Sequence, residues 1–137
     1  MPHLILEHSA NVSDVADIAG LVVVLHHAAL ATGIAPLDAL RTRAAQSDIY
    51  AVGDEYPKNG FIAVTARLAP GRSDSDKQIL TEALMAALSD ALGDAQDNLM
   101  LSVEYQEIDP LFRINKNNLR SVIAERNIRH EGTRRGC

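Results

Sequence analysis

The sequence is poor in cysteine and lacks a long hydrophobic run. Its single cysteine, Cys137, excludes an intrachain disulfide and is badly placed for a buried nucleophile. This is typical of a protein kept in a reducing compartment. No apolar stretch approaches the ~20 residues that a transmembrane helix needs, and the first residues lack the basic and then apolar pattern of a signal peptide. We therefore expect a cytoplasmic protein that does not insert into a membrane.

The motifs of common cofactor and hydrolase sites are also missing. The sequence contains no phosphate loop, no dinucleotide-binding glycine fingerprint and no Ser-His-Asp order. His26 and His27 are adjacent, so on a helix they point about 100° apart and cannot share one metal ion as residues four apart can. We expect neither a cofactor nor a metal.

The charges are distributed unevenly along the chain. From Arg113 onward there are seven Lys or Arg residues and two Glu residues, whereas the preceding part is strongly acidic. A basic end is typical of nucleic-acid binding, but this one has no aromatic residue beyond Phe112 for base stacking and matches no known binding module. We therefore expect no nucleic acid, and a tail that is either solvated or packed against a neighbouring subunit.

What the chain does contain is an alternation of strand and helix patterns. Of the 137 residues, 47% are hydrophobic and 23% charged, as in a single domain with its own core. Four strands are predicted, over residues 3–9, 36–53, 60–70 and 98–108, the second being the weakest. One helix is predicted from a cap at Ser13 to Gly33, and another from Ser73 to Gly93, with Ser73 and Asp76 forming a capping-box-like start.

This order of elements predicts two β-α-β units. Each crossover should be right-handed and join parallel strands, which gives an α/β (α+β) fold with a four-stranded sheet and two helices of about 18 to 20 residues on one face. Hydrophobic residues of the helices would cover that face: Val22, Val23, Leu25 and Leu30 in the first, and Leu80, Leu84, Leu88 and Leu92 in the second. Nothing covers the other face, so apolar residues there would need a partner subunit.

Four segments resemble one known family. "PHLILEHSAN" at the start, "TGIAPLDALRTR" at 32–43, "GRS" at 71–73 and "INKNN" at 114–118 are similar to the 5-carboxymethyl-2-hydroxymuconate isomerases of the tautomerase superfamily. The resemblance covers Pro2 to about Arg120. We take residues 1–120 as the domain and residues 121–137 as a basic tail, either partly helical or disordered. The resemblance implies the doubled β-α-β fold, a homotrimer, no cofactor, and an N-terminal proline as catalytic base.

Pro2 can act as a base only after Met1 is removed, because only then is its ring nitrogen an amine. A proline amine is more basic than an ordinary α-amino group, whose pKa is about 7.7–8.0. Burial in an apolar pocket and nearby arginines would lower its pKa toward neutrality, where a base works best. For an arbitrary Met-Pro start an idle proline is the simpler interpretation. The resemblance reverses this and makes Pro2 the predicted catalytic residue.

The resemblance also implies substrate-binding arginines. Arg41 matches the family's substrate-contacting arginine, and Arg72 precedes the second helix, where its guanidinium and the helix amides would hold a carboxylate. We expect Arg43 to point to the opposite side of the sheet from Arg41 and to form a surface ion pair, the simpler interpretation for any of these arginines. His3, beside Pro2, either lines the pocket or packs as an ordinary histidine.

Together, the residues and the resemblance predict a cofactor-independent isomerase, a keto-enol tautomerase acting on unsaturated 2-hydroxy or 2-oxo acids with two or three carboxylates. The expected enzyme is a 5-carboxymethyl-2-hydroxymuconate delta-isomerase of aromatic compound catabolism. Pro2 would be the catalytic base, and Arg41, Arg72 and His3 would bind the substrate. Two alternatives stay open: a hydratase or dehalogenase with the same fold, and a non-catalytic trimeric binding protein.

Overall fold

The computed structural model describes residues 2–135, and side chains as far as residue 127. The described residues form four strands and three α-helices: β1 (His3–Ser9), α1 (Ile18–Ala31), β2 (Arg41–Ser47), β3 (Gly60–Leu68), α2 (Asp74–Leu92), β4 (Leu99–Glu107) and α3 (Leu119–Arg135). Three short 3-10 helices join them: η1 (Ala10–Asp14), η2 (Gly93–Asn98) and η3 (Pro110–Phe112). None of the described helices is long and apolar enough to cross a membrane.

The four strands form one mixed sheet in the order β2-β1-β3-β4. β1 runs parallel to β2, β3 runs parallel to β4, and the two pairs meet where β1 lies antiparallel to β3. Each parallel pair is joined through a helix, because a tight hairpin cannot connect parallel strands. The two β-α-β units of the sequence prediction are therefore present, and the weakly predicted second strand is β2.

The first helix begins later than predicted. Ser13 does not cap it; residues 10–14 form the 3-10 turn η1, and α1 begins after Asp17 and has 14 residues. The Ser13 hydroxyl instead donates to Gln46 Oε1 over 3.3 Å. This partner lies 33 residues away along the chain, so the Ser13 hydroxyl is engaged by β2 and not by the start of a helix. The second helix begins as predicted, with the Ser73 hydroxyl accepting from Asp76 N over 3.1 Å.

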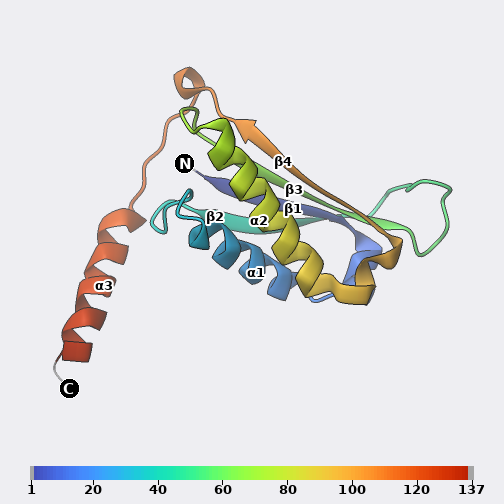
Figure 1. The fold of residues 1–137 in the computed structure, drawn as a ribbon, viewed down its shortest axis with the longest axis horizontal. Helices are drawn as coiled ribbons and strands as arrows, with labels where there is room; N and C mark the ends of the chain where they lie inside the picture. Colours follow the sequence, from blue (N-terminus) through green and yellow to red (C-terminus); the bar gives the residue numbers. More distant parts are fainter. Residues whose placement is uncertain (1, 136–137) are drawn as a thin grey trace.

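One face of the sheet is buried under the helices. Figure 1 shows α1 and α2 side by side in front of the sheet. Leu4 and Leu6 of β1 and every second residue of β3 pack with both helices in one cluster. The predicted stripe of leucines on α2 is buried. On α1 the buried residues are Leu21, Leu25 and Ala29, whereas Val23, expected in the core, is 52% exposed because it lies on the outer side of the helix.

The opposite face of the sheet is open in the single chain. Its central strands carry Ile5, Ala63 and Thr65, all half-buried, and its β4 edge carries exposed residues such as Met100 and Glu104. The two edge strands make this face largely polar, because β2 places Arg41 and Arg43 on it and β4 places Ser102, Glu104 and Gln106 on it. No part of the described chain covers it as α1 and α2 cover the other face.

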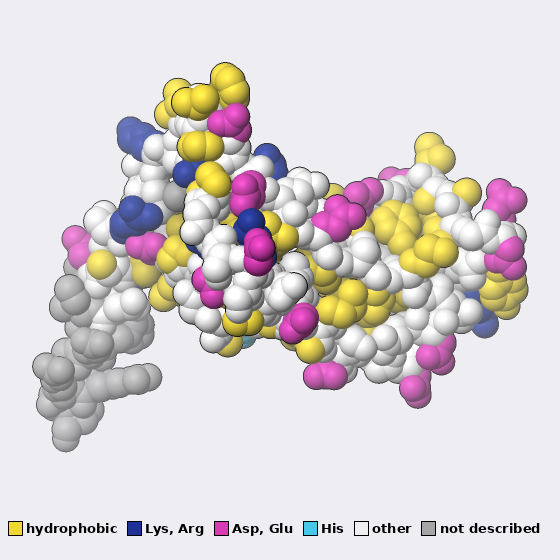
Figure 2. Space-filling model, turned by 45° about the horizontal axis from the view of Figure 1, so that its top comes forward, with side chains coloured by type: hydrophobic (Ala, Val, Ile, Leu, Met, Phe, Trp, Pro, Cys, Tyr) yellow, Lys and Arg dark blue, Asp and Glu magenta, His cyan; other side chains and the backbone are white. Residues whose placement is uncertain are grey.

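After β4 the chain forms an arm that ends in α3, to one side of the sheet (Figure 1). The arm carries Leu111, Phe112 and Ile114, which are 82–100% exposed. Figure 2 shows hydrophobic side chains gathered at the end of the molecule where this segment lies. The residues 121–137 that we predicted as a basic tail lie in α3 as far as the structure describes them. The boundary between domain and tail remains a prediction.

Candidate active site

Pro2 lies buried immediately before β1. Its carbonyl oxygen accepts a hydrogen bond from Arg41 N over 3.4 Å, which joins it to the start of β2. Side chains alternate along a strand, so Pro2 is in phase with the core residue Leu4, whereas His3 lies on the open face. The pairing of His3 with Arg67 also places the end of β3 beside Pro2. Pro2 therefore lies where three strands and the loops that join them to the helices meet.

On the open face, two arginines surround His3. Arg41 Nε donates to His3 Nδ1 over 3.1 Å, and Arg41 Nη2 lies 2.7 Å from His3 Nε2. Arg43 Nη1 lies 3.2 Å from the same Nδ1 atom. The prediction that Arg43 points away from Arg41 is therefore wrong, because residues two apart in a strand share a face. Thr42, between them, points to the helices, where its hydroxyl lies 2.8 Å from His26 Nδ1.

The surroundings of His3 favour its neutral form. Partial burial, together with the positive charges of Arg41, Arg43 and Arg67, lowers the His3 pKa to about 4. A neutral imidazole has only one acceptor nitrogen, and guanidinium groups can only donate. The cluster of His3, Arg41, Arg43 and Arg67, which we call the arginine cluster, therefore offers more donors than it has acceptors. An arrangement of this kind is suited to binding an anion.

Arg72 is held by the backbone of two loops. Its Nη1 donates to Ala69 O over 3.1 Å and its Nη2 to Ile34 O over 3.2 Å. These bonds join the loop after β3 to the loop after α1, at the same end of the sheet as Pro2. Arg41 and Arg72 therefore both lie near this end, but their guanidinium groups contact different partners. A guanidinium has five N–H donors, so Arg72 keeps donors beyond these two bonds.

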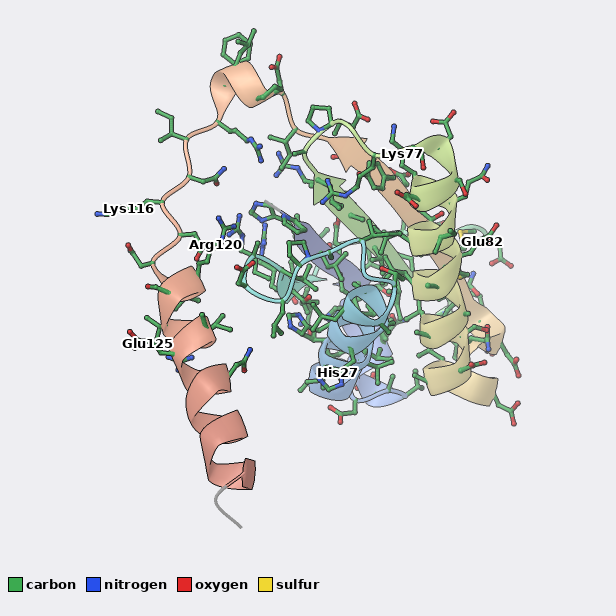
Figure 3. All side chains as sticks on the ribbon, turned by 60° about the vertical axis from the view of Figure 1, so that its left-hand side comes forward. His27, Lys77, Glu82, Lys116, Arg120 and Glu125 are labelled. Atoms are coloured by element: carbon green, nitrogen blue, oxygen red, sulfur yellow. The ribbon has the colours of Figure 1, made fainter. Side chains whose placement is uncertain are left out.

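The segment "INKNN" holds the loop that leads into β2. Asn117 Nδ2 donates to Asp38 O over 2.7 Å, and Arg120 Nε donates to Asp38 Oδ2 over 2.9 Å. Figure 3 shows Arg120 at the start of α3, on the side facing the sheet. Asp38 lies only three residues before Arg41, so these contacts fix the entry to β2. The sequence analysis did not assign this role, because the partners lie about 80 residues apart along the chain.

Two further polar side chains near this end of the sheet were missed from the sequence. The Tyr105 hydroxyl and Arg113 Nη1 are buried without a hydrogen-bond partner among the described residues. Tyr105 lies on β4 beneath the ammonium group of Lys77, which is 2.7 Å from Glu107 Oε1. This contact with Glu107 raises the Lys77 pKa. Figure 3 shows Lys77 at the start of α2. Strand alternation predicts the face on which Tyr105 lies, but it does not predict its unused hydroxyl.

Three surface clefts of the single chain lie away from these residues. Three open clefts have volumes of about 450, 370 and 320 Å³. The first is lined by the loop that follows β2, at the opposite end of the sheet from Pro2. None of these three clefts is lined by Pro2, His3, Arg41 or Arg72. Among the described residues, no group of three or more His, Cys, Asp or Glu side chains is placed to hold a metal ion.

A mixed four-stranded sheet made of two β-α-β units is the fold of tautomerase-like proteins, and known structures share it. One described as a symmetric trimer of wild-type fused 4-OT superposes with a TM-score of 0.59 at 20% identity, over 85% of this chain and 92% of that one. At this identity the similarity shows the fold alone.

The family model of the 5-carboxymethyl-2-hydroxymuconate isomerases matches residues 2–123, and the chain belongs to this family. The 5-carboxymethyl-2-hydroxymuconate Delta-isomerase of Escherichia coli is 29% identical over 124 residues, covering 89% of this chain and 98% of that protein. The structure of a 5-carboxymethyl-2-hydroxymuconate isomerase from Deinococcus radiodurans is 32% identical, with a TM-score of 0.81 over 89% of this chain and 93% of that one. These relatives indicate an isomerase of the tautomerase type.

Proposed function

We propose that this protein is a cofactor-independent isomerase that moves a proton within unsaturated 2-hydroxy or 2-oxo polycarboxylic acids, in the breakdown of aromatic compounds. The names of its relatives, 5-carboxymethyl-2-hydroxymuconate isomerases, support this substrate type. The observation that supports it most directly is the position of Pro2, buried at the head of β1 and joined by its carbonyl to the β2 residue Arg41. An amine at this position would be partly desolvated and close to positive charge.

In the proposed reaction, Pro2 is the base. Removal of Met1, which lies outside the described residues, would convert the Pro2 nitrogen from an amide into a secondary amine. Burial and the nearby arginines both disfavour the protonated form of that amine and lower its pKa. The free amine would take a proton from the hydroxyl end of a dienol and return it to a carbon further along the conjugated system. A base that both accepts and returns a proton works best with a pKa near the working pH.

The arginines would bind the carboxylates of the substrate and stabilise the dienolate. Arg41 already contributes to a region with more hydrogen-bond donors than acceptors, and Arg72 keeps free donors while two loops hold it in place. Charge that develops on the substrate oxygen is stabilised best by donors that are already oriented before the reaction. His3, which stays neutral above a pH of about 4, would accept or donate one hydrogen bond in this region.

We also propose that the enzyme is a homotrimer. The open face of the sheet supports this, because its central residues are only half-buried in the single chain. The similarity of the fold to fused 4-OT structures described as trimers supports it as well. A cyclic arrangement of three copies would cover the open face with neighbouring subunits.

An ultraviolet absorbance assay with 5-carboxymethyl-2-hydroxymuconate tests the activity. We expect the dienol chromophore to change at a rate proportional to enzyme concentration, and at least about 10²-fold more slowly with the Pro2→Ala variant. The enzyme should need no added metal or cofactor after dialysis against a chelator. Consumption of an unsaturated or halogenated acid in place of isomerisation would contradict the proposal in favour of a hydratase or dehalogenase. Tight binding of the acid without turnover would favour a binding protein.

A further inference from the structure

The open face of the sheet carries opposite charges at its two edges. Strand pairing aligns Arg43 of β2 with Ile5 of β1, Ile5 with Thr65 of β3, and Thr65 with Glu104 of β4. Arg43 and Glu104 therefore end the same row of side chains across the sheet. β2 and β4 are its two edge strands, so the basic and the acidic residue lie at opposite edges and at the same level along the strands.

At the basic edge, the described residues offer fewer hydrogen-bond acceptors than the arginines have donors. Arg43 is exposed, and its Nη1 lies 3.2 Å from His3 Nδ1, an atom that also lies within hydrogen-bond distance of Arg41. One imidazole nitrogen cannot accept fully from both guanidinium groups. The ion pairs within 4.0 Å among the described residues involve Lys77 and Arg120, and not Arg43. Among the described residues, Arg43 is therefore a charged donor without an acidic partner.

The acidic edge carries an exposed carboxylate that is outside the ion pairs of the described residues. Glu104 is exposed on β4, between the exposed residues Ser102 and Gln106 of the same face. It takes part in none of the ion pairs among the described residues. The middle of its row consists of Ile5 and Thr65, which carry no charge and are half-buried. An edge strand also offers unpaired backbone groups to a neighbouring chain.

We propose that the β2 edge of one copy docks against the β4 edge of a second copy, and that Arg43 and Glu104 form an ion pair across this interface. Because both residues end the same row, edge-to-edge docking without a shift along the strands brings them together. Two β2 edges would repel each other through Arg41 and Arg43, so charge favours the head-to-tail arrangement. Each copy then offers one edge of each kind, and such heterologous contacts form a ring when the rotation between copies closes, as it would with three copies in the proposed homotrimer. The inference rests on the proposed homotrimer and specifies which residues orient it.

Charge reversal tests this interface. We would measure the molar mass of Arg43→Glu, Glu104→Arg and the double variant by size-exclusion chromatography with light scattering, over a range of protein concentrations. Each single variant should dissociate at concentrations at least about tenfold above those at which the native assembly dissociates, since it places like charges together. The double variant should restore assembly, because it exchanges the two charges and keeps the pair.

Matched controls separate this effect from general changes of charge. Glu82 lies exposed on α2, the helical side of the molecule, as Figure 3 shows, and Arg126 is exposed on α3. Glu82→Arg and Arg126→Glu should assemble like the native protein. If circular dichroism shows that a charge-reversed variant does not fold, the milder variants Arg43→Gln and Glu104→Gln replace it in the same measurement. Their double variant should then dissociate no more readily than either single variant, since the pair is already lost.

Three results would overturn the inference. The first is a native protein that stays monomeric, and the second is a pair of folded single variants that assemble normally or are not rescued by the double variant. The third is an Arg43→Glu variant that assembles normally but no longer binds the polycarboxylate, because Arg43 would then serve the substrate. The absorbance assay on the native protein reports the proposed activity separately. A native enzyme that is trimeric and active, but whose assembly does not depend on the Arg43 and Glu104 charges, would therefore contradict only this inference.

Discussion

The two faces of the sheet differ in what the single chain provides for them. On the face toward α1 and α2, every second residue of β3 is buried, including Ile62, Val64 and Leu68, which are at most 1% exposed. Residues between them, such as Thr65 and Arg67, belong to the open face and are only half-buried. The face toward the helices is therefore fully buried within one chain, whereas the side chains of the open face remain partly exposed to solvent.

The difference shows that one strand can serve folding and function at the same time. Leu4 and Leu6 of β1 gain stability by leaving water, which any apolar residue of suitable size would provide. His3, between Pro2 and Leu4, instead contacts two guanidinium groups and depends on their chemical type. We expect substitutions on the helical face to change stability, and substitutions at Pro2 and on the open face to change activity or assembly.

The largest effect should come from the start of β1. A chain that keeps Met1 has an amide at Pro2 and should be folded but inactive, so activity should follow the fraction of chains without Met1 in intact mass spectra. Pro2→Ala leaves a primary amine without the ring and should lower kcat by about 10²-fold or more, with unchanged circular dichroism. The kcat/KM of the native enzyme should rise with pH through a pKa below that of a free proline amine.

The next largest effect should come from the buried face. Leu84→Ala on α2 removes a fully buried side chain from the core and should lower the free energy of unfolding by about 2–5 kcal/mol. The matched variant Ser102→Ala, on the exposed face of β4, should change it by less than about 0.5 kcal/mol. Denaturant unfolding measures both. Equal losses of free energy in the two variants would mean that the open face contributes to stability as much as the core does. This would contradict the difference between the two faces.

The arginines should have a somewhat smaller effect, and one on catalysis. Arg41→Ala and Arg72→Ala should each raise KM and lower kcat on a dicarboxylate, with a loss of about 2–4 kcal/mol of transition-state binding. Arg72→Ala should also lower stability slightly, because its bonds to Ala69 O and Ile34 O disappear. Unchanged kinetics of both variants would return these arginines to the role of surface charges.

The smallest effect should be a pH dependence of stability that originates at His3. Its pKa in the folded protein is about 4, below its ordinary value of 6.5, so the unfolded chain binds the proton more tightly. The free energy of unfolding should therefore rise from pH 4 to pH 6.5 and then stay constant. Because solvent screens these partly exposed groups, we expect a contribution of about 1 kcal/mol. His3→Gln should flatten this slope in denaturant titrations; an identical slope would exclude His3 as its source.

Local sequence patterns predicted most of the fold. Alternation of apolar residues in β3, and the spacing of four leucines on α2, follow from the geometry of strands and helices and needed no tertiary information. The start of α1 was predicted wrongly at Ser13, because that residue bonds to Gln46 of β2, which is distant in the sequence. Val23 was assigned to the core on hydrophobicity alone, but the smaller Ala29 lies there.

The candidate site was less accessible to sequence reasoning. The resemblance to a family indicated Pro2, Arg41 and Arg72, and their roles remain predictions. The position of Arg43 beside His3 follows from strand periodicity, which was misapplied to residues two apart. The contacts of Arg72 with carbonyl oxygens of two loops, one of them 38 residues away, depend on the folded chain. No local pattern encodes such a contact.

The contacts of Asp38 indicate when the loop that leads into β2 is stabilised during synthesis. Its carbonyl and carboxylate oxygens are held by Asn117 and Arg120, 79 and 82 residues further along the chain. During synthesis, the N-terminal β-α-β unit emerges first, but the loop that leads into β2 gains these contacts only when almost the whole chain has been made. The loop that leads to Arg41 therefore gains two of its long-range contacts late in synthesis, and a nascent chain stopped before Asn117 would lack both of them.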